Sequence, residues 1–198
     1  LVSTWYNILG AFHKSRPDLA QRCLQCMQNY IEWIDITLVT TEQWVNLLFY
    51  LLGVDLLREE ACDCLFEIVT KRMENPSPKL KLLQRLNICY VLPSMIKVLV
   101  AEIEQEREDY SEEQFGLKMA RLSMNVGNEL LDVIEKAEGH ANQNTATPET
   151  RQHAHALAEE ALRLLDGSLP WLCSLFGVPH TAVSTGMLDF ITPYVAKL

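Results

Sequence analysis

The sequence contains few glycines and prolines, eight of each among 198 residues, and most of them stand at the boundaries of predicted helices. It has no glycine-rich phosphate-binding loop and no Gly-x-Ser-x-Gly motif, so these two signatures of nucleotide and acyl chemistry are excluded. No segment alternates apolar and polar residues between hairpin turns, which argues against a β-sheet. We therefore expect an all-α protein that is not an enzyme.

Long apolar runs are also missing. The most apolar stretch, from Trp44 to Leu57, is shorter than the ~20 residues that a membrane-spanning helix needs, and it contains Asn46 and Asp55. The first residues lack the basic region, the apolar run and the small-residue cleavage site of a signal peptide. We therefore predict a soluble chain with no membrane partner. The first residue is Leu1 and the last residues continue a helical pattern, so we expect a piece of a longer protein.

Positive charge is scarce, with 17 basic and 26 acidic residues and a formal net charge of −9. From Glu102 to Glu113 there are seven acids and one arginine, a local charge of −6, which leaves the rest of the chain nearly neutral. The absence of a basic stripe argues against a protein that coats DNA or RNA. The acidic run itself is either a solvated helix end or a docking patch for a basic partner.

The stretch from Asp55 to Arg72 has the clearest helical pattern. Its apolar residues recur at helical spacing and predict one buried face. Asp55 is expected to cap the helix N-terminus, and the two basic residues at the end suit the helix dipole. The predicted buried residues are Leu57, Ala61, Cys64, Leu65 and Ile68, and those expected to face solvent or a partner are Arg58, Glu59, Asp63, Glu67 and Lys71.

Part of the chain repeats itself. Three residues of the first helix, Trp5, Asn7 and Leu9, reappear 39 positions later as Trp44, Asn46 and Leu48, and Cys23-Leu24 reappears 41 positions later as Cys64-Leu65. Both sets lie on predicted helices in the same order. A unit of two helices and about 40 residues matches the length of HEAT and armadillo repeats.

The chain therefore predicts a HEAT-repeat α-solenoid, a single continuous stack of about four antiparallel helix pairs, at approximately 1–34, 41–73, 78–137 and 148–198. The second helices of such pairs usually line the concave wall; here they are predicted at 17–33, 56–72, 112–137 and 180–198. Thr40 or Thr41 is expected to cap a helix. At Pro93 we expect either a kink or a new helix start within the long helical pattern that begins at Leu80. Residues 139–148 are expected to form a polar loop.

Cysteine and histidine patterns give little support for a metal site. Cys23 with Cys26 and Cys62 with Cys64 could supply four thiolates, but the two pairs differ in spacing and Cys64 belongs to the buried stripe. Structural thiols are therefore the preferred interpretation, and cysteines inside helices favour a reducing compartment, the cytosol or nucleus. His153 and His155 diverge on a helix, and there is no His-Glu-x-x-His motif. We expect no metal, no cofactor and no catalytic residue.

Two small basic groups lie near the predicted concave wall. The first group is Lys71 with Arg72, and the second is Lys118 with Arg121. Lys118 and Arg121 share a helix face because they are three residues apart. Ordinary protein surface and phosphate contact are both open interpretations of these groups.

Three strings carry a resemblance to a known family. They are Tyr30-Ile31-Glu32-Trp33-Ile34-Asp35, Trp44-Val45-Asn46-Leu47-Leu48 and Leu57-Arg58-Glu59-Glu60-Ala61-Cys62-Asp63-Cys64-Leu65-Phe66-Glu67-Ile68-Val69. The region from Tyr30 to Lys71 resembles the tRNA exportins of the importin-β (karyopherin) superfamily. The resemblance implies an internal segment, in the N-terminal half of a longer receptor, built as part of a HEAT-repeat superhelix.

The resemblance also implies a function. A receptor of this family binds tRNA cooperatively with the GTP form of Ran in the nucleus, passes the nuclear pore proteins and releases its cargo in the cytoplasm. It would shuttle between nucleus and cytoplasm without an obligate homo-oligomer. Shape and phosphate backbone would dominate tRNA recognition. A karyopherin or scaffold that binds only protein is the alternative. The tRNA-binding candidates are then Lys71, Arg72, Lys118 and Arg121, and the candidates for contacts to Ran or between repeats are Arg58, Glu59, Glu60, Asp63 and Glu67.

Overall fold

The computed structural model describes the backbone of residues 1–104, 110–144, 147–177 and 181–197, without the side chains of 102–104, 110–113, 181, 182 and 186. The acidic run 102–113 therefore lies outside the described side chains. All regular structure in the described ranges is helical, which confirms the all-α prediction. The helices are α1 (Val2–Phe12), α2 (Pro17–Ile31), η1 (Ile36–Leu38), α3 (Glu42–Leu52), α4 (Arg58–Thr70), α5 (Pro76–Leu86), α6 (Ile88–Glu104), α7 (Tyr110–Ala141), α8 (Pro148–Phe176), α9 (Thr181–Gly186) and α10 (Leu188–Lys197).

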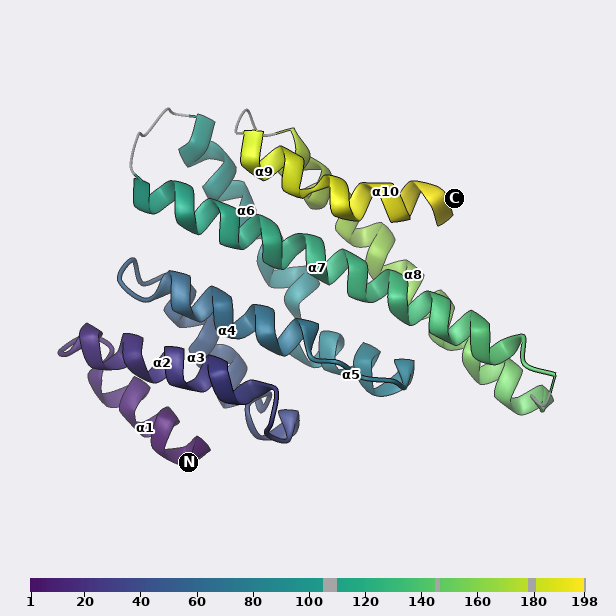
Figure 1. The fold of residues 1–198 in the computed structure, drawn as a ribbon, viewed down its shortest axis with the longest axis horizontal. Helices are drawn as coiled ribbons and strands as arrows, with labels where there is room; N and C mark the ends of the chain where they lie inside the picture. The colour runs from purple at the N-terminus through teal and green to yellow at the C-terminus, as the bar shows by residue number, and fades with distance from the viewer. Residues whose placement is uncertain (105–109, 145–146, 178–180, 198) are drawn as a thin grey trace.

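The helices form two layers, as expected for a HEAT-like solenoid. In Figure 1, α2, α4, α7 and α10 lie side by side in one layer, and α1, α3 and α8 lie behind them. Contacts run along the first layer from α2 to α4, from α4 to α7 and from α7 to α10, while α1 pairs with α2, α3 with α4 and α8 with α7. Each helix thus buries its apolar stripe against its neighbours in the stack.

The repeated residues occupy matching places. Trp5 and Trp44 are buried in α1 and α3, and Cys23 and Cys64 are buried in α2 and α4. The Cys64 thiol donates to the carbonyl oxygen of Leu24 at 3.3 Å. The residue pattern shared by the two helix pairs therefore serves the packing of one pair on the next.

Helix α4 differs from its prediction in two ways. The predicted stripe is fully buried, but Cys62 and Arg58 are buried as well because α7 covers a second face of the helix. The prediction of one buried face, with Arg58 outside it, was therefore wrong. Asp55 is not the N-cap either: α4 starts after Leu57, which makes no side-chain capping bond. Thr41 does cap α3, by accepting a hydrogen bond from the Trp44 amide.

The long helical pattern predicted from Leu80 breaks at Asn87, and no new helix starts at Pro93. Asn87 adopts the left-handed conformation, with φ 53°, and closes α5, a role that asparagine can take at helix ends. Pro93 lies inside α6. In the described part of the chain no single helix is long and apolar enough to cross a membrane, although α5 and residues 88–101, which meet at 49°, reach that composition together.

Candidate ligand-binding surface on the α4–α7 layer

Lys71 holds the end of a neighbouring helix. Its ammonium group donates to the backbone carbonyl oxygens of Ile31, Glu32 and Ile34 at 2.8–2.9 Å. These carbonyls end α2 and the turn after it, where backbone acceptors have no partners within the helix. A lysine at this position satisfies them and suits the negative end of the helix dipole. Lys71, predicted as a tRNA contact, is thus engaged inside the fold.

Lys118 joins α7 to α4. Its ammonium group lies 2.7 Å from the Asp63 carboxylate and 3.2 Å from that of Glu59. All three side chains are partly exposed. The pKa of Lys118 is raised above its ordinary value: burial acts to lower it, and the two carboxylates together outweigh that effect. Three predicted contact residues thus meet at one place, as an ion-paired cluster between successive helix pairs.

Two arginines along the same contact lie over aromatic rings. The Arg121 guanidinium is 3.9 Å from the centre of the Phe66 ring, and that of Arg58 is 4.7 Å from the centre of the Phe115 ring. Both contacts join α4 to α7. We call the contact between these two helices the α4–α7 seam.

The other candidates lie nearer to solvent. Glu60 accepts a hydrogen bond from the Gln25 amide of α2 at 3.3 Å. Glu67 is half-buried, and Arg72 is exposed and makes no ion pair with any residue whose side chain the structure describes. Of the four predicted tRNA contacts, Lys71, Lys118 and Arg121 already contact other residues of the fold. Arg72 is the one whose guanidinium makes no such contact with the described side chains.

The most buried charge among the described side chains was not predicted from the sequence. Lys79 of α5 is 2% exposed; its ammonium group lies 2.7 Å from the Glu129 carboxylate of α7 and donates to the carbonyl oxygens of Val69 and Lys71. Burial lowers the pKa of Lys79 and raises that of Glu129, and the ion pair opposes both shifts. A signal was present, since Lys79 shares the apolar face of α5 with Leu83 and Leu86, four and seven residues on.

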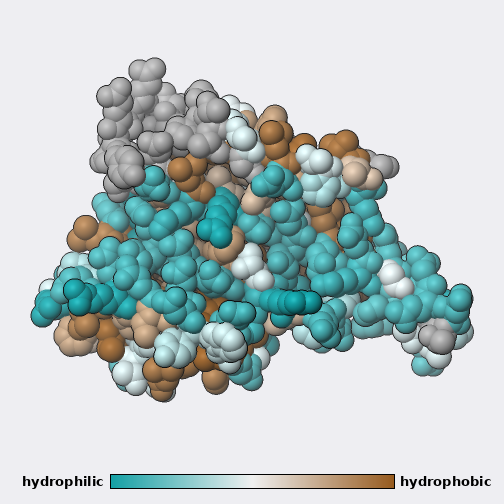
Figure 2. Space-filling model, in the orientation of Figure 1, coloured by the Kyte–Doolittle hydropathy of each residue, from teal (hydrophilic) through white to brown (hydrophobic). Residues whose placement is uncertain are grey.

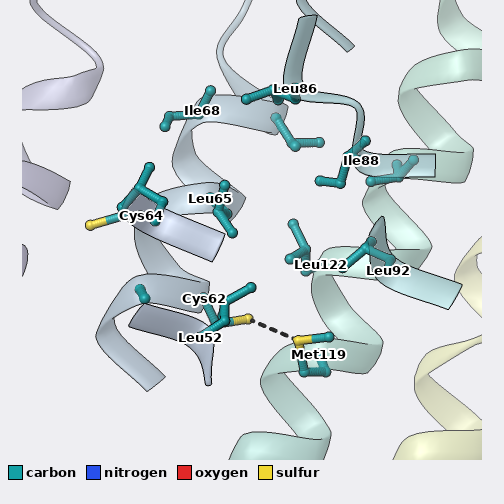
Figure 3. Close-up of a cluster of buried hydrophobic side chains, with 14 of the residues drawn as sticks. Leu52, Cys62, Cys64, Leu65, Ile68, Leu86, Ile88, Leu92, Met119 and Leu122 are labelled. Carbon is teal, nitrogen blue, oxygen red and sulfur yellow. Dashed lines mark hydrogen bonds between the residues drawn. The ribbon is translucent and has the colours of Figure 1, made fainter. Parts of the chain in front are cut away.

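The buried thiols act as core groups. Burial raises the pKa of the Cys23 thiol to about 11 and also raises the pKa values of Cys62 and Cys64. In Figure 3, the Cys62 sulfur points toward the Met119 sulfur, 3.8 Å away, while that of Cys64 points to the opposite side of α4. Two thiols that diverge in this way cannot bind the same ion. Within the described ranges, no group of three His, Cys, Asp or Glu residues could hold a metal.

This geometry predicts selective thiol labelling. In the native chain at pH 8, the exposed Cys26 and Cys173 should react rapidly with an alkylating reagent, because a thiolate forms and is reached by the reagent only where solvent has access. Cys62 and Cys64 should react only after denaturation. Peptide mapping by mass spectrometry would identify the modified residues, and rapid native labelling of Cys64 would contradict the packing described for α4.

The charges define what this surface can contact. Figure 2 shows the face over α4 and α7 as mostly hydrophilic, with apolar side chains gathered along the lower edge over α1, α2 and α3. Four acids of α4 belong to this layer, while Lys118 of α7 is already ion-paired within it and Arg121 stacks on the Phe66 ring. The seam can therefore exchange ion pairs with a charged macromolecule. The four acids are Glu59, Glu60, Asp63 and Glu67.

Comparison with known proteins agrees with this architecture. Residues 1–65 match the family described as "Exportin 1-like protein". An engineered protein of solved structure aligns over 96% of this chain and 78% of its own, with 15% identity and a TM-score of 0.45. The fold and the family match together define an exportin-type α-solenoid segment.

Curated relatives align along the whole chain. Exportin-T of Mus musculus is 30% identical over 98% of this chain, and exportin-T of Dictyostelium discoideum is 31% identical over 100% of it. Exportin-T of Homo sapiens is 40% identical over 48% of it. The chain is thus homologous to a segment of exportin-T, which confirms the resemblance seen in the sequence. It spans 18% of the mouse relative and 16% of the Dictyostelium relative.

Proposed function

We propose that this chain forms part of a karyopherin-type nuclear export receptor for tRNA. The receptor binds tRNA together with the GTP form of Ran, crosses the pore by contacts with nuclear pore proteins and releases its cargo in the cytoplasm. It is a shuttling transport receptor and not an enzyme. The observation that carries this proposal is the homology to exportin-T along the entire chain, on a layered helical scaffold of the expected kind.

Cooperative binding has a simple physical meaning here. If tRNA and Ran each bind more tightly when the other is present, the two sites share a coupling free energy, and the effect must be reciprocal. When Ran in its GTP form is lost, the receptor then binds tRNA with lower affinity. A solenoid provides such coupling because all its helix pairs belong to one continuous stack.

The candidate contacts divide into two groups on structural grounds. Lys71 caps α2 and Lys118 bridges two acids, so changing either side chain alters the fold as well as any ligand contact. Arg121 stacks on Phe66, which orients its guanidinium without neutralising it. Arg72 and Arg121 are therefore the clearest candidates for phosphate contact.

Replacing Arg72 by glutamate in the full-length receptor is expected to weaken tRNA binding and to reduce its salt dependence, because one phosphate contact is lost. The slope of log K against log salt should become shallower by about one counterion. The change should leave thermal stability intact because Arg72 is exposed. Lys14→Glu, an equal charge change at an exposed site of the α1–α2 turn, is the matched control; the same slope for both variants and the parent would remove Arg72 from the site.

A second function is favoured by the surplus of acids on α4. A karyopherin that binds only protein would use this face for a basic protein surface, and complementary charge would speed and orient that encounter. In that case Glu59, Glu60, Asp63 and Glu67 serve Ran or a protein cargo.

The cellular distribution of tRNA separates the two functions. Depleting the full-length protein should cause mature tRNA to accumulate in the nucleus, as measured by in situ hybridisation, and a tRNA-independent nuclear export cargo serves as the control. An unchanged tRNA distribution, with a protein cargo retained in the nucleus, would favour the protein-only receptor.

A further inference from the structure

A groove runs between α6 and α8, and α8 lies in the layer behind α4 and α7 (Figure 1). It consists of two adjoining cavities of about 380 and 220 Å³, which share Cys89, Tyr90 and Leu164 in their linings. The larger cavity reaches Trp171 of α8, and the smaller one reaches Glu160 of the same helix. These two residues are about three helical turns apart, roughly 16 Å along the helix axis. We call this feature the α6–α8 groove.

The walls of the α6–α8 groove are largely aromatic and apolar. Tyr90 is 73% exposed at its rim, and Trp171 is buried in its wall. The charged residues that line it, Arg163 and Glu160, form an ion pair with each other. Because these two charges compensate each other, the groove suits an uncharged ligand better than a charged one. The remaining lining of the larger cavity includes Pro93, Gly167 and Pro170.

Trp171 also carries a hydrogen-bond donor that the fold does not use. Its Nε1–H group is buried and has no acceptor in the described part of the chain. Such a donor is costly to leave unpaired, and buried indole N–H groups usually find a partner. Because Trp171 forms part of the groove wall, a carbonyl oxygen of a bound ligand can supply the missing acceptor.

We propose that the α6–α8 groove binds a proline-rich segment of a partner protein in the polyproline II conformation. Such a segment makes no internal hydrogen bonds, so its carbonyl groups are available as acceptors for the Trp171 indole. Its prolines have no N–H group, so few donors lose water without gaining a partner. At about 3.1 Å per residue, about five residues fill the length of the groove.

This mode of recognition uses rings that are already in place. Proline-rich segments dock in grooves lined by aromatic side chains, and their stiffness lowers the entropy lost on binding. Here the proline rings of the partner would pack against Tyr90 while the Trp171 indole donates to one of its carbonyl groups. The groove makes no use of tRNA or Ran, so this proposal can fail while the export function stands, and the reverse.

The binding test uses the full-length receptor and a fluorescein-labelled decaproline peptide, without tRNA or Ran. Fluorescence anisotropy is expected to show saturable binding of decaproline and no binding of a glycine–serine peptide of the same length. Absence of saturable decaproline binding would overturn the proposal.

A substitution that fills the groove locates the peptide. Nothing lies within 4 Å of a Cβ atom added at Gly167, so Gly167→Leu should place its side chain in the groove and leave the fold intact. Tyr90→Ala removes the exposed ring at the rim. Each change should weaken decaproline binding about fivefold or more, the loss typical of a residue that matters in an interface. Gly139→Leu in α7, another exposed site with nothing within 4 Å of the added Cβ, is the matched control and should bind like the parent.

Trp171→Phe tests the indole donor, because it keeps an aromatic ring and removes the N–H group. It should weaken binding about threefold, as expected for one lost hydrogen bond. If this variant does not fold, as judged by circular dichroism, the exposed positions Gly167 and Tyr90 decide. Equal decaproline binding by Gly167→Leu and the parent would overturn the proposal. Tighter binding of a glycine–serine peptide that carries one phenylalanine, lost in Gly167→Leu, would also overturn it, because the groove would then take a single apolar anchor.

Discussion

Replacing Lys79 by methionine is expected to lower the free energy of unfolding by about 3–5 kcal/mol, the cost of breaking a buried ion pair from one side. The methionine fills a similar volume but removes the donor for the Val69 and Lys71 carbonyl groups. It also leaves the Glu129 carboxylate, 19% exposed, without its partner. Denaturant unfolding followed by circular dichroism measures the loss.

A double substitution tests the physical reason for this loss. Lys79→Met with Glu129→Leu removes both charges, so it should cost clearly less than the sum of the two single changes. Lys81→Met, two residues away on the exposed face of α5, is the matched control and should fall within about 0.5 kcal/mol of the parent. The proposed role of the pair would be contradicted if the costs of the two changes simply added in the double variant. It would also be contradicted if Lys79→Met lowered the free energy of unfolding by less than about 1 kcal/mol, because an unpaired buried charge usually costs more than that.

The second large effect is expected at Gly127 of α7. A Cβ atom at this position would lie 2.5 Å from Cε2 and 2.6 Å from Cδ2 of the Phe190 ring. Phe190 is buried, so the ring cannot move away freely. Gly127→Ala should therefore destabilise the chain by about 1–3 kcal/mol through overpacking, although alanine favours the helix itself by up to about 1 kcal/mol.

Hydrogen exchange locates this effect, because α10 packs on α7 at the substituted position. Amides of α10 should exchange faster in Gly127→Ala, and those of α4 should not change. Gly167→Ala in α8 is the matched control: nothing lies within 4 Å of its added Cβ, so it should be neutral or stabilising. A stabilised Gly127→Ala variant would show that α7 and α10 are not in close contact there.

Helical periodicity was enough to predict the all-α fold and most of the buried stripe of α4. It could not predict the second buried face of α4, because the residues that cover it come from α7, more than 50 positions later. The break at Asn87 was missed for a similar reason. A proline is a strong local signal, but Pro93 is accommodated inside α6, and a left-handed asparagine has no comparable signature in one sequence.

The sequence predicted which part of the chain holds the candidate site, but not how the side chains of that site are arranged. Charge spacing selected Lys71 and Lys118, and the structure shows that they hold carbonyl groups and acids within the fold. Which lysine faces a ligand and which closes a helix end depends on the neighbouring helix pair. For the same reason, the sequence pattern did not single out Lys79, which carries the most buried charge in the described ranges.

We propose that this chain belongs to a receptor in which tRNA and Ran strengthen each other's binding. The most direct test of this proposal is the tRNA affinity of the full-length protein with and without Ran loaded with a non-hydrolysable GTP analogue. We predict that Ran raises the affinity at least about tenfold, a coupling of about 1.4 kcal/mol or more. If Ran binds while tRNA fails to bind in either condition, the tRNA export function is contradicted and a receptor for protein cargo takes its place.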